Sequence, residues 1–326
     1  MKRSSVPLII GLIVLFFVVT MGLVALLAGP ALSGGMASGG FSLPFGERIA
    51  ILEVEGVLGE GPAYGADTKR LREAVERWTD DPSIKGMVIR INSPGGGVSA
   101  TQDLYHAVEK FAAEKPVVVS MGDVAASGGY YLAMAADEVY ANSGTLTGSV
   151  GVILSFWGYQ ELTDKIGLEP RTVKSGQFKD IGSGSRPMTE EEKALLNDMI
   201  QDVYEQFYAV VYDARAEIAR DVIARNSGRP VASVTDEEVD DYLRSYCDGR
   251  IFSGNQALEY GMVDKLGTLD EAIEAMKSRL GISAEDVHLV LTPKPTPGLF
   301  GKMNQKLEQI GNAAPGSVKL EFRFSM

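Results

Sequence analysis

The sequence predicts an α/β fold with a parallel sheet, preceded by a membrane-spanning helix. Residues 48–58 and 84–92 are apolar, strand-like runs, and residues 66–78 between them carry apolar side chains at helical spacing. A strand, a helix and a second strand in succession favour a parallel crossover. Residues 6–28 carry no charge, and at about 1.5 Å per residue such a helix spans a hydrocarbon core of roughly 30 Å.

Composition excludes several functional classes. The chain has 326 residues, of which 45% are apolar and 23% charged, so it is long and apolar enough for a sizeable folded core. Its net charge of −12, without a Lys/Arg-rich stripe, argues against nucleic-acid binding. The single cysteine, Cys247, excludes an intrachain disulfide and a Cys-rich zinc site, and we expect it to be a small buried side chain. We expect neither a metal nor a cofactor.

The ends of the chain define its organisation. Lys2 and Arg3 precede the apolar segment and no further charge occurs before Glu47, so the positive-inside rule predicts a cytoplasmic N-terminus and an external remainder. A cleaved signal peptide is the alternative, but its apolar region is usually about 7–15 residues long. We therefore divide the chain into an anchor (1–28), a Gly/Ser-rich linker (29–46), a catalytic domain (47–280) and a C-terminal extension without an assigned role (281–326).

Strands and helices continue to alternate after the first crossover. We expect further strands at 116–122, 137–141, 149–154, 170–175, 287–292 and 318–324. We expect helices at 99–114, from 130, at 189–225 and at 235–246, and a turn, a short strand and two helices within 248–276. Thr189 followed by Glu192 is a capping box that marks the start of the longest helix.

Ser127 is the candidate nucleophile. It lies in a small-residue turn between a strand and a helix, where free backbone N–H groups favour a developing negative charge. The alternative is a serine that only caps the helix. Gly95, Gly96 and Gly97 follow the preceding strand, and both turns should meet at one edge of a parallel sheet. Because the Walker and G-x-G-x-x-G patterns are absent, an oxyanion-holding turn fits better than a phosphate loop.

A serine needs a base, and the sequence offers few candidates. The only histidines are His106, within a helical segment, and His288, in a late strand, so a Ser-His-Asp triad is disfavoured. A lysine, whose ordinary pKa is about 10.4, can serve if burial lowers that pKa. Lys179 is best placed, in a Gly/Ser-rich loop before a capped helix, while Lys174 and Lys165 are alternatives.

Five ordered segments stand out in the sequence: RINSPGGGV (90–98), MGDVAASGGYYLAMAAD (121–137), TLTGSVGVI (145–153), SGQFKDIGSGSRPMTEEE (175–192) and DGRIFSGNQALEYGMVDKLGTLDEAI (248–273). Together they resemble the signal peptide peptidase A/protease IV family of serine peptidases. The resemblance implies a ClpP/crotonase-like fold and a Ser-Lys dyad, with Ser127 as nucleophile and Lys179 as general base. Family members often have a proline after GS, where this chain reads GSGSRP.

The remaining site residues follow from this mechanism. Backbone N–H groups of Gly95 or Gly96, together with Gly128, are expected to hold the oxyanion. Ser149 is a candidate for orienting the lysine amine, and its alternative role is a turn hydroxyl that bonds its own backbone.

The resemblance also implies substrates and partners. Protease IV carries two copies of the domain and splits the dyad between them, whereas this chain has one, so we expect a ring or dome of identical subunits in which a partner can supply Lys179. The expected substrates are hydrophobic remnant signal peptides on the outer side of the cytoplasmic membrane. The alternatives are a membrane quality-control protease of the same fold, a crotonase-like enzyme acting on acyl-CoA, and a scaffold without chemistry.

Overall fold

The computed structural model describes residues 47–61, 63–282 and 287–292. The predicted anchor, the linker, the 318–324 strand and most of the C-terminal extension lie outside these residues. Among the residues that the structure describes, no helix has both the length and the apolar character needed to cross a membrane.

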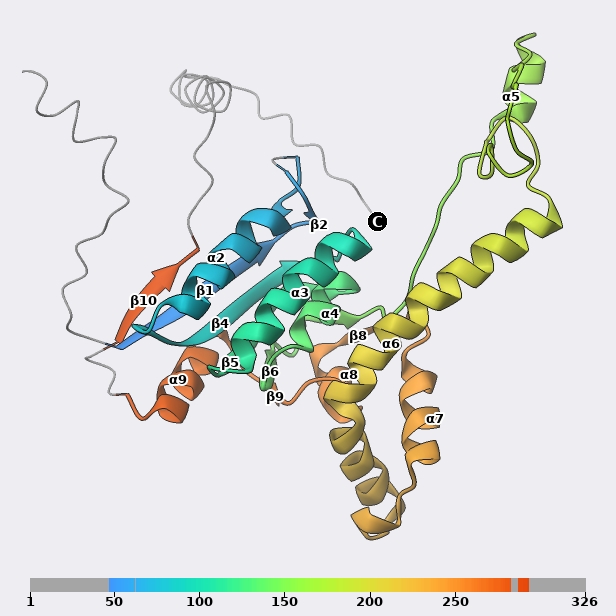
Figure 1. The fold of residues 1–326 in the computed structure, drawn as a ribbon. Coiled ribbons are helices and arrows are strands. Elements are labelled where there is room, and N and C mark those ends of the chain that lie inside the picture. The colour runs from blue at the N-terminus through green and yellow to red at the C-terminus, as the bar shows by residue number, and fades with distance from the viewer. Residues whose placement is uncertain (1–46, 62, 283–286, 293–326) are drawn as a thin grey trace, which may run out of the picture. The chain divides into compact units, whose positions relative to one another are not determined.

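A central sheet organises the domain (Figure 1). Its main path runs in the order β10-β1-β4-β5-β6-β9 and every pairing along it is parallel. The strands are β1 (Glu47–Glu55), β4 (Ile84–Ser93), β5 (Val117–Ala126), β6 (Glu138–Ala141), β9 (Lys265–Leu266) and β10 (Val287–Leu291). A separate short pair joins β2 (Leu58–Gly59) to β3 (Ala66–Asp67). The parallel α/β architecture expected from the sequence is therefore confirmed.

Helices cover both faces of the sheet. Helices α2 (Thr68–Asp80) and α3 (Val98–Ala112) lie on one face and α9 (Leu269–Leu280) on the other (Figure 1). Successive residues of β1 divide accordingly, since Leu52 and Val54 join the large core cluster that includes α2 and α3, while Ile49 and Ile51 pack with Met276 of α9. This burial on two faces explains why β1 is a nearly continuous apolar run rather than an alternating one.

Strand β5 changes its neighbour halfway along its length. Residues 118–120 pair with β6, whereas 124–126 pair with β7 (Leu146–Gly148). The register against β4 shifts at the same place, because Ile91 lies opposite Met121 and Ser93 opposite Ala125. We expected the strand to end at residue 122, but it continues to Ala126 and carries the backbone directly to Ser127.

The remaining elements match the expected order in part, and α5 (Gln160–Lys165) and β7 are among those that were not expected. Helix α6 (Glu190–Ser227) and helix α7 (Asp236–Tyr246) both begin at capping boxes, and β8 (Ile251–Ser253) precedes α8 (Gly254–Glu259). Residues 149–154 form no strand, because Ser149 has a φ of 52° that ends β7 at Gly148. The strand expected at 170–175 does not form, since these residues pair with no strand of the described chain. Strand β9, in contrast, was not expected from the sequence.

Residues 153–200 form a projection that we call the arm. It holds α5 (Gln160–Lys165) and the first part of α6, and Figure 1 shows it extending away from the sheet. Apart from Glu192, no residue of α6 is buried before Phe207. The arm exposes many large apolar side chains: Ile153, Leu154, Phe156, Trp157, Tyr159, Leu162, Ile166, Leu168, Val173, Leu195 and Met199.

Candidate active site

Ser127 adopts a backbone conformation that favours glycine. It lies between β5 and α4 (Gly128–Ala133) with a φ of 52° and a ψ of −121°. Such a conformation costs about 1–3 kcal/mol for a residue with a side chain. The Ser127 N–H donates to Gly148 O at 2.9 Å, and Ser127 O accepts from Tyr131 N at 2.9 Å. The turn therefore stores strain at the candidate nucleophile, where such strain is commonly functional.

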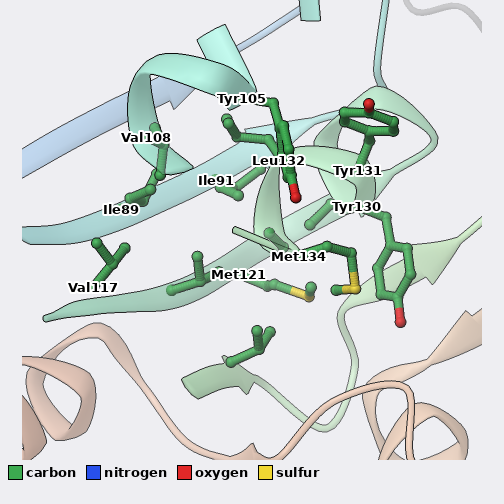
Figure 2. Packing of buried hydrophobic residues seen from close by; sticks show 14 of the residues in the cluster. Ile89, Ile91, Tyr105, Val108, Val117, Met121, Tyr130, Tyr131, Leu132 and Met134 are labelled. Atoms are coloured by element: carbon green, nitrogen blue, oxygen red, sulfur yellow. The ribbon is translucent and has the colours of Figure 1, made fainter. Parts of the chain in front are cut away.

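Helix α4 is too short to contribute much dipole, but the core fixes it firmly. Tyr130 is fully buried and its hydroxyl donates to Met262 O at 2.7 Å. Tyr131 packs edge-on against Tyr105, with ring centroids 4.9 Å apart, and against Phe207 at 5.1 Å. Figure 2 shows the side chains of Tyr130 and Tyr131 pointing in different directions into the hydrophobic core. Because these contacts lie immediately after Ser127, the turn cannot relax without disturbing the core.

The Ser127 hydroxyl has no structural role within the helix. Ser127 occupies the N-cap position of α4, yet its side chain makes no capping hydrogen bond. The residue is partly exposed. The alternative role of Ser127, as an N-cap only, therefore lacks the hydrogen bond from a helix N–H to the serine hydroxyl that defines such a cap.

The glycine turn after β4 lies against Ser127. Gly95 has a φ of 99°, and a Cβ built on it would lie 2.7 Å from Gly128 N and 2.9 Å from Ser127 Cβ. Leu58 pairs with this turn, because its N–H donates to Gly95 O and its carbonyl accepts from Gly97 N, both at 2.9 Å. A Cβ on Gly96 would lie 2.0 Å from Leu58 O, so only glycine fits there as well.

The hydrogen bonds of this turn distinguish the three expected oxyanion donors. The Gly95 N–H donates to Ser93 Oγ at 3.1 Å and is occupied. Within the described chain, the N–H groups of Gly96 and Gly128 have no hydrogen-bond acceptor. The geometry thus favours Gly96 and Gly128 over Gly95 as donors to an oxyanion.

A small cavity opens beside the serine. Its volume is about 40 Å³, and the lining includes Ser127, Gly96 and Gly128. The rest of the lining is mostly apolar: Val98, Thr101, Gln102, Tyr131, Gly151, Val152, Val203 and Phe207. Sequence reasoning missed the α6 contributions, because only the fold brings Val203 and Phe207 to a serine that is so distant in the sequence. Their only local signal is an apolar face on a long helix.

Lys179 is not brought to Ser127 within one chain. It is exposed in a turn of the arm, it does not line the cavity, and its amine has no hydrogen-bond or ion-pair partner among the described residues. Figure 1 shows the arm carrying α5 well apart from α4. Lys174 pairs with Asp180 at 2.6 Å, and Lys165 lines a separate cleft beside α5.

The other titratable candidates do not reach the cavity either. His106 is exposed and its Nδ1 lies 3.2 Å from Glu109 Oε2 on the surface of α3. His288 is exposed on β10, the terminal strand of the sheet. Cys247 is buried as expected, and burial raises the pKa of its thiol to about 12. No triad of Ser127 with a histidine forms.

Ser149 follows Gly148, which pairs with Ala126 and accepts the N–H of Ser127. Its N–H donates to Arg250 O at 2.7 Å and its φ of 52° turns the chain sharply. The Ser149 hydroxyl makes no hydrogen bond to any described residue, so the expected alternative of a hydroxyl bonded to its own backbone is not seen. The hydroxyl is therefore available to a group that enters the site.

A strained serine at the carboxyl edge of a parallel sheet, beside two unpaired backbone N–H groups, is the arrangement of a serine hydrolase. The model of peptidase family S49 matches residues 109–230, which include Ser127, Ser149 and Lys179. A protein from Synechocystis named as a protease is 34% identical over 251 residues, covering 77% of this chain and 81% of that protein. This chain belongs to peptidase family S49, and it is a serine peptidase by class.

Two further proteins are similar to this chain. A protein from Enterococcus faecium named as a signal peptide peptidase SppA is 30% identical over 238 residues, covering 71% of this chain and 63% of that protein. The solved structure of a mutant of the 1510-N membrane-bound stomatin-specific protease with a substrate peptide has a TM-score of 0.43 and 14% identity, covering 82% of this chain and 100% of that one. The resemblance to the signal peptide peptidase A/protease IV family is thereby confirmed at the level of sequence.

Proposed function

We propose that this protein is a membrane-anchored serine endopeptidase with a ClpP/crotonase-like fold that degrades remnant signal peptides. The observation that carries the proposal is Ser127, held in a strained conformation without a capping bond beside the free N–H groups of Gly96 and Gly128. The E. faecium relative that is named as a signal peptide peptidase supports the choice of substrate.

In the proposed mechanism, Ser127 Oγ attacks the scissile carbonyl while the neutral amine of Lys179 accepts the hydroxyl proton. The N–H groups of Gly96 and Gly128 stabilise the oxyanion, each donor contributing about 3–4 kcal/mol to the transition state. The lysine then protonates the leaving amine, which departs and leaves an acyl ester on Ser127. Water, activated by the same lysine, hydrolyses the ester and restores the serine. Ser149, whose hydroxyl bonds to no residue that the structure describes, orients the lysine amine during these transfers.

We propose that Lys179 reaches Ser127 from a neighbouring subunit of a homo-oligomeric ring or dome. Lys179 lies on the arm, and the arm exposes apolar side chains that a monomer would leave in water, including Trp157 at 88% and Ile153 at 87%. Large apolar side chains exposed together on one projection are typical of interaction surfaces. A heterologous contact, in which each arm packs on the next subunit, closes into a ring and completes every site identically.

The cavity beside Ser127 supports a preference for small apolar residues at the cleavage site. Its volume of about 40 Å³ suits a side chain of one to three carbons, and its walls include Val98, Val152 and Phe207. An extended peptide that crosses this cavity presents its scissile carbonyl to the N–H groups of Gly96 and Gly128. Signal peptides, which are rich in small and apolar residues, meet both requirements.

The proposed location follows from the sequence of the first 46 residues. A retained helix at 6–28 places the N-terminus in the cytoplasm and the catalytic domain outside. The tether at 29–46 then holds the active site close to the membrane in which remnant signal peptides remain.

The decisive experiment measures cleavage of a signal peptide by the full-length protein in lipid vesicles. Ser127→Ala and Lys179→Ala should each abolish cleavage while leaving the thermal midpoint unchanged, and Lys165→Ala, an exposed lysine on the same arm, should remain active. A Lys179→Ala enzyme with wild-type activity would overturn the dyad. Intact signal peptide alongside degraded fragments of membrane proteins would instead support a quality-control protease.

A second measurement tests the shared site. If each site takes its serine and lysine from different subunits, random exchange between equal amounts of the two inactive variants should restore about a quarter of the sites. Absence of any recovery, with subunit exchange verified by a label, would place the dyad in one chain.

A further inference from the structure

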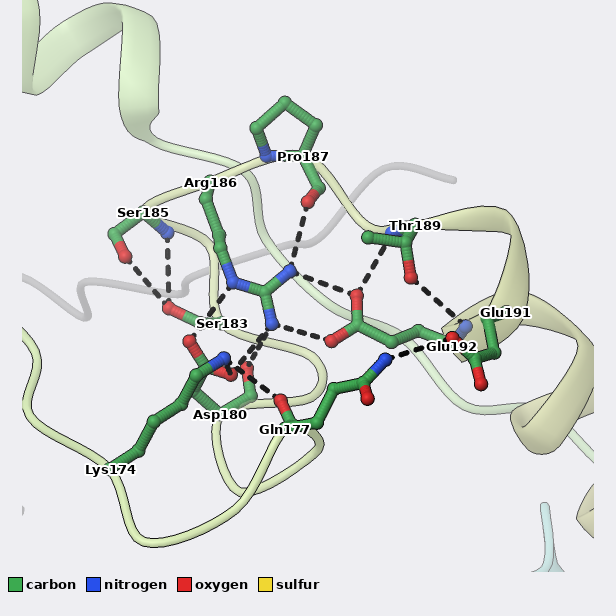
Figure 3. Close-up of polar contacts among 10 residues, drawn as sticks. All are labelled: Lys174, Gln177, Asp180, Ser183, Ser185, Arg186, Pro187, Thr189, Glu191 and Glu192. Carbon is green, nitrogen blue, oxygen red and sulfur yellow. Dashed lines mark hydrogen bonds and ion pairs between the residues drawn. The ribbon is translucent and has the colours of Figure 1, made fainter.

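The loop that carries Lys179 is closed by one arginine that bridges two carboxylates. Arg186 Nε and Nη2 donate to the two oxygens of Asp180 at 3.0 and 2.7 Å, and Arg186 Nη1 donates to Glu192 Oε2 at 2.9 Å (Figure 3). Nη2 also contacts Glu192 Oε1. Such forked contacts fix the plane of the guanidinium as well as its position.

Glu192 anchors this arginine to the start of α6. Its side chain is only 3% exposed and also accepts the N–H of Thr189 at 2.9 Å within the capping box. Arg186 and the Thr189 N–H lower the pKa of the Glu192 carboxyl to about 2. Glu192 therefore stays ionised and holds Arg186 at a fixed place relative to the helix.

Asp180, the residue after Lys179, is paired with two cations. Besides the two bonds from Arg186, its Oδ1 accepts from Lys174 Nζ at 2.6 Å, and Lys174 Nζ also donates to Gln177 O at 2.8 Å. Hydrogen bonds from Arg186 and then Lys174 hold the pKa of the Asp180 carboxyl well below its usual range. Lys179, the nearest cation along the chain, has no partner in the described residues. Both oxygens of the adjacent carboxylate thus already accept from other cations and not from the Lys179 amine.

We propose that Arg186 is a positioning residue for Lys179: it ties the loop to α6 and occupies the Asp180 carboxylate that would otherwise form an ion pair with the catalytic amine. The proposal rests on the proposed function, because it takes Lys179 to be the base. An amine paired with a carboxylate keeps its proton more strongly, so the bridge keeps the lysine able to accept a proton from serine.

Two elements beside this loop contribute further charges. The first turn of α6 contributes Glu190, paired with Lys193 at 2.6 Å, and Glu191, which accepts from Gln177 Nε2 at 2.9 Å. Across a cleft of about 470 Å³, α5 contributes Glu161 and Lys165. Asp180 is the only one of these carboxylates that adjoins Lys179 in sequence. We therefore expect that freeing Asp180 from Arg186 lets this carboxylate pair with the Lys179 amine.

The test compares pH profiles of signal-peptide cleavage by the full-length protein in vesicles of fixed composition. Arg186→Gln should raise the pH of half-maximal kcat/KM by about one unit, so that the rate near neutral pH falls about tenfold, through kcat and not KM. The double variant Arg186→Gln/Asp180→Asn should return the half-maximal pH to that of wild type. Arg171→Gln, which removes a charge from an exposed pair on the same arm, should leave the profile unchanged.

Each outcome decides the proposal. Rates lowered equally at every pH, or a shift that persists in the double variant, would show that Arg186 only stabilises the loop. If Arg186→Gln does not assemble, Arg186→Lys is measured instead, because it keeps the charge but cannot bond to both carboxylates at once. We expect a smaller upward shift in the pH of half-maximal kcat/KM for this variant. A wild-type profile would show that the forked contacts of Arg186 have no role in positioning Lys179. Lys179→Ala is measured in the same series, and activity there refutes the dyad whatever Arg186 does.

Discussion

Substituting Gly95 by alanine should damage catalysis as well as folding. A Cβ at this position would lie 2.7 Å from Gly128 N and 2.9 Å from Ser127 Cβ. Both neighbours are held by the turn into α4, so neither atom can move away cheaply. Either the glycine turn or the serine turn must shift, and the alignment of Gly96 N, Gly128 N and Ser127 Oγ is lost.

The structure separates the two costs of Gly95→Ala. The φ of 99° is unfavourable for alanine and should lower the free energy of unfolding by about 1–3 kcal/mol. Misplacing one oxyanion donor removes about 3–4 kcal/mol of transition-state stabilisation, or about 100- to 1000-fold in kcat. Gly97→Ala is the matched control, because Gly97 has a φ of −65° and its Cβ would meet no atom closer than 3.8 Å.

The assay measures kcat on a membrane-embedded signal peptide, the rate at which a fluorophosphonate labels Ser127, and the thermal midpoint of each variant. We expect Gly97→Ala to match wild type in all three. A folded Gly95→Ala enzyme with a kcat within about threefold of Gly97→Ala would refute the reasoning, because the backbone around Gly95 would then not define the oxyanion site.

Three further outcomes are expected. Ser127→Gly should have a higher free energy of unfolding than Ser127→Ala by about 1 kcal/mol, measured by denaturant, because glycine adopts a φ of 52° without strain; equal values would argue against strain at the nucleophile. Glu192→Gln should have a lower free energy of unfolding than wild type at pH 7, because the ionised Glu192 carboxylate stabilises the folded state. This difference should shrink as the pH falls below about 4.5 and vanish near 2, where the carboxyl takes up its proton. A difference that is independent of pH would contradict this. A version beginning at Phe41 should cleave short apolar peptides in solution as well as the full-length enzyme but lose its advantage on peptides embedded in the same bilayer, and equal rates on embedded peptides would argue against tethering.

The local pattern of the sequence predicted most of the elements that frame the site. Burial on both faces made β1 and β4 apolar runs, and capping boxes at Thr189 and Thr235 marked the first residues of α6 and α7. The change of partner along β5 could not be predicted, because it depends on pairing with β6 and β7, two strands that only the fold places beside the two halves of β5.

The candidate site divides in the same way between local and tertiary information. Ser127 was predictable because a turn of small residues after a buried strand is a local signal. The choice between Gly95 and Gly96 as oxyanion donor was not predictable, because it depends on which N–H group already has an acceptor. In the structure, Ser93 Oγ accepts the N–H of Gly95. The contribution of Phe207 to the cavity required the packing of α6 against α4.

The exposure of Lys179 connects catalysis to assembly. A lysine can act as a base near neutral pH only where burial disfavours its charged form, and the arm of a single chain leaves Lys179 in solvent. The same arm exposes Val173 completely and Trp157 at 88%, a cost that a neighbouring subunit would remove. In the proposed oligomer, the contact that buries these apolar side chains is also the contact that brings the amine to Ser127 and excludes water from it. A lone subunit would then hold a formed oxyanion site without a competent base, so that proteolysis would begin only where the ring is complete.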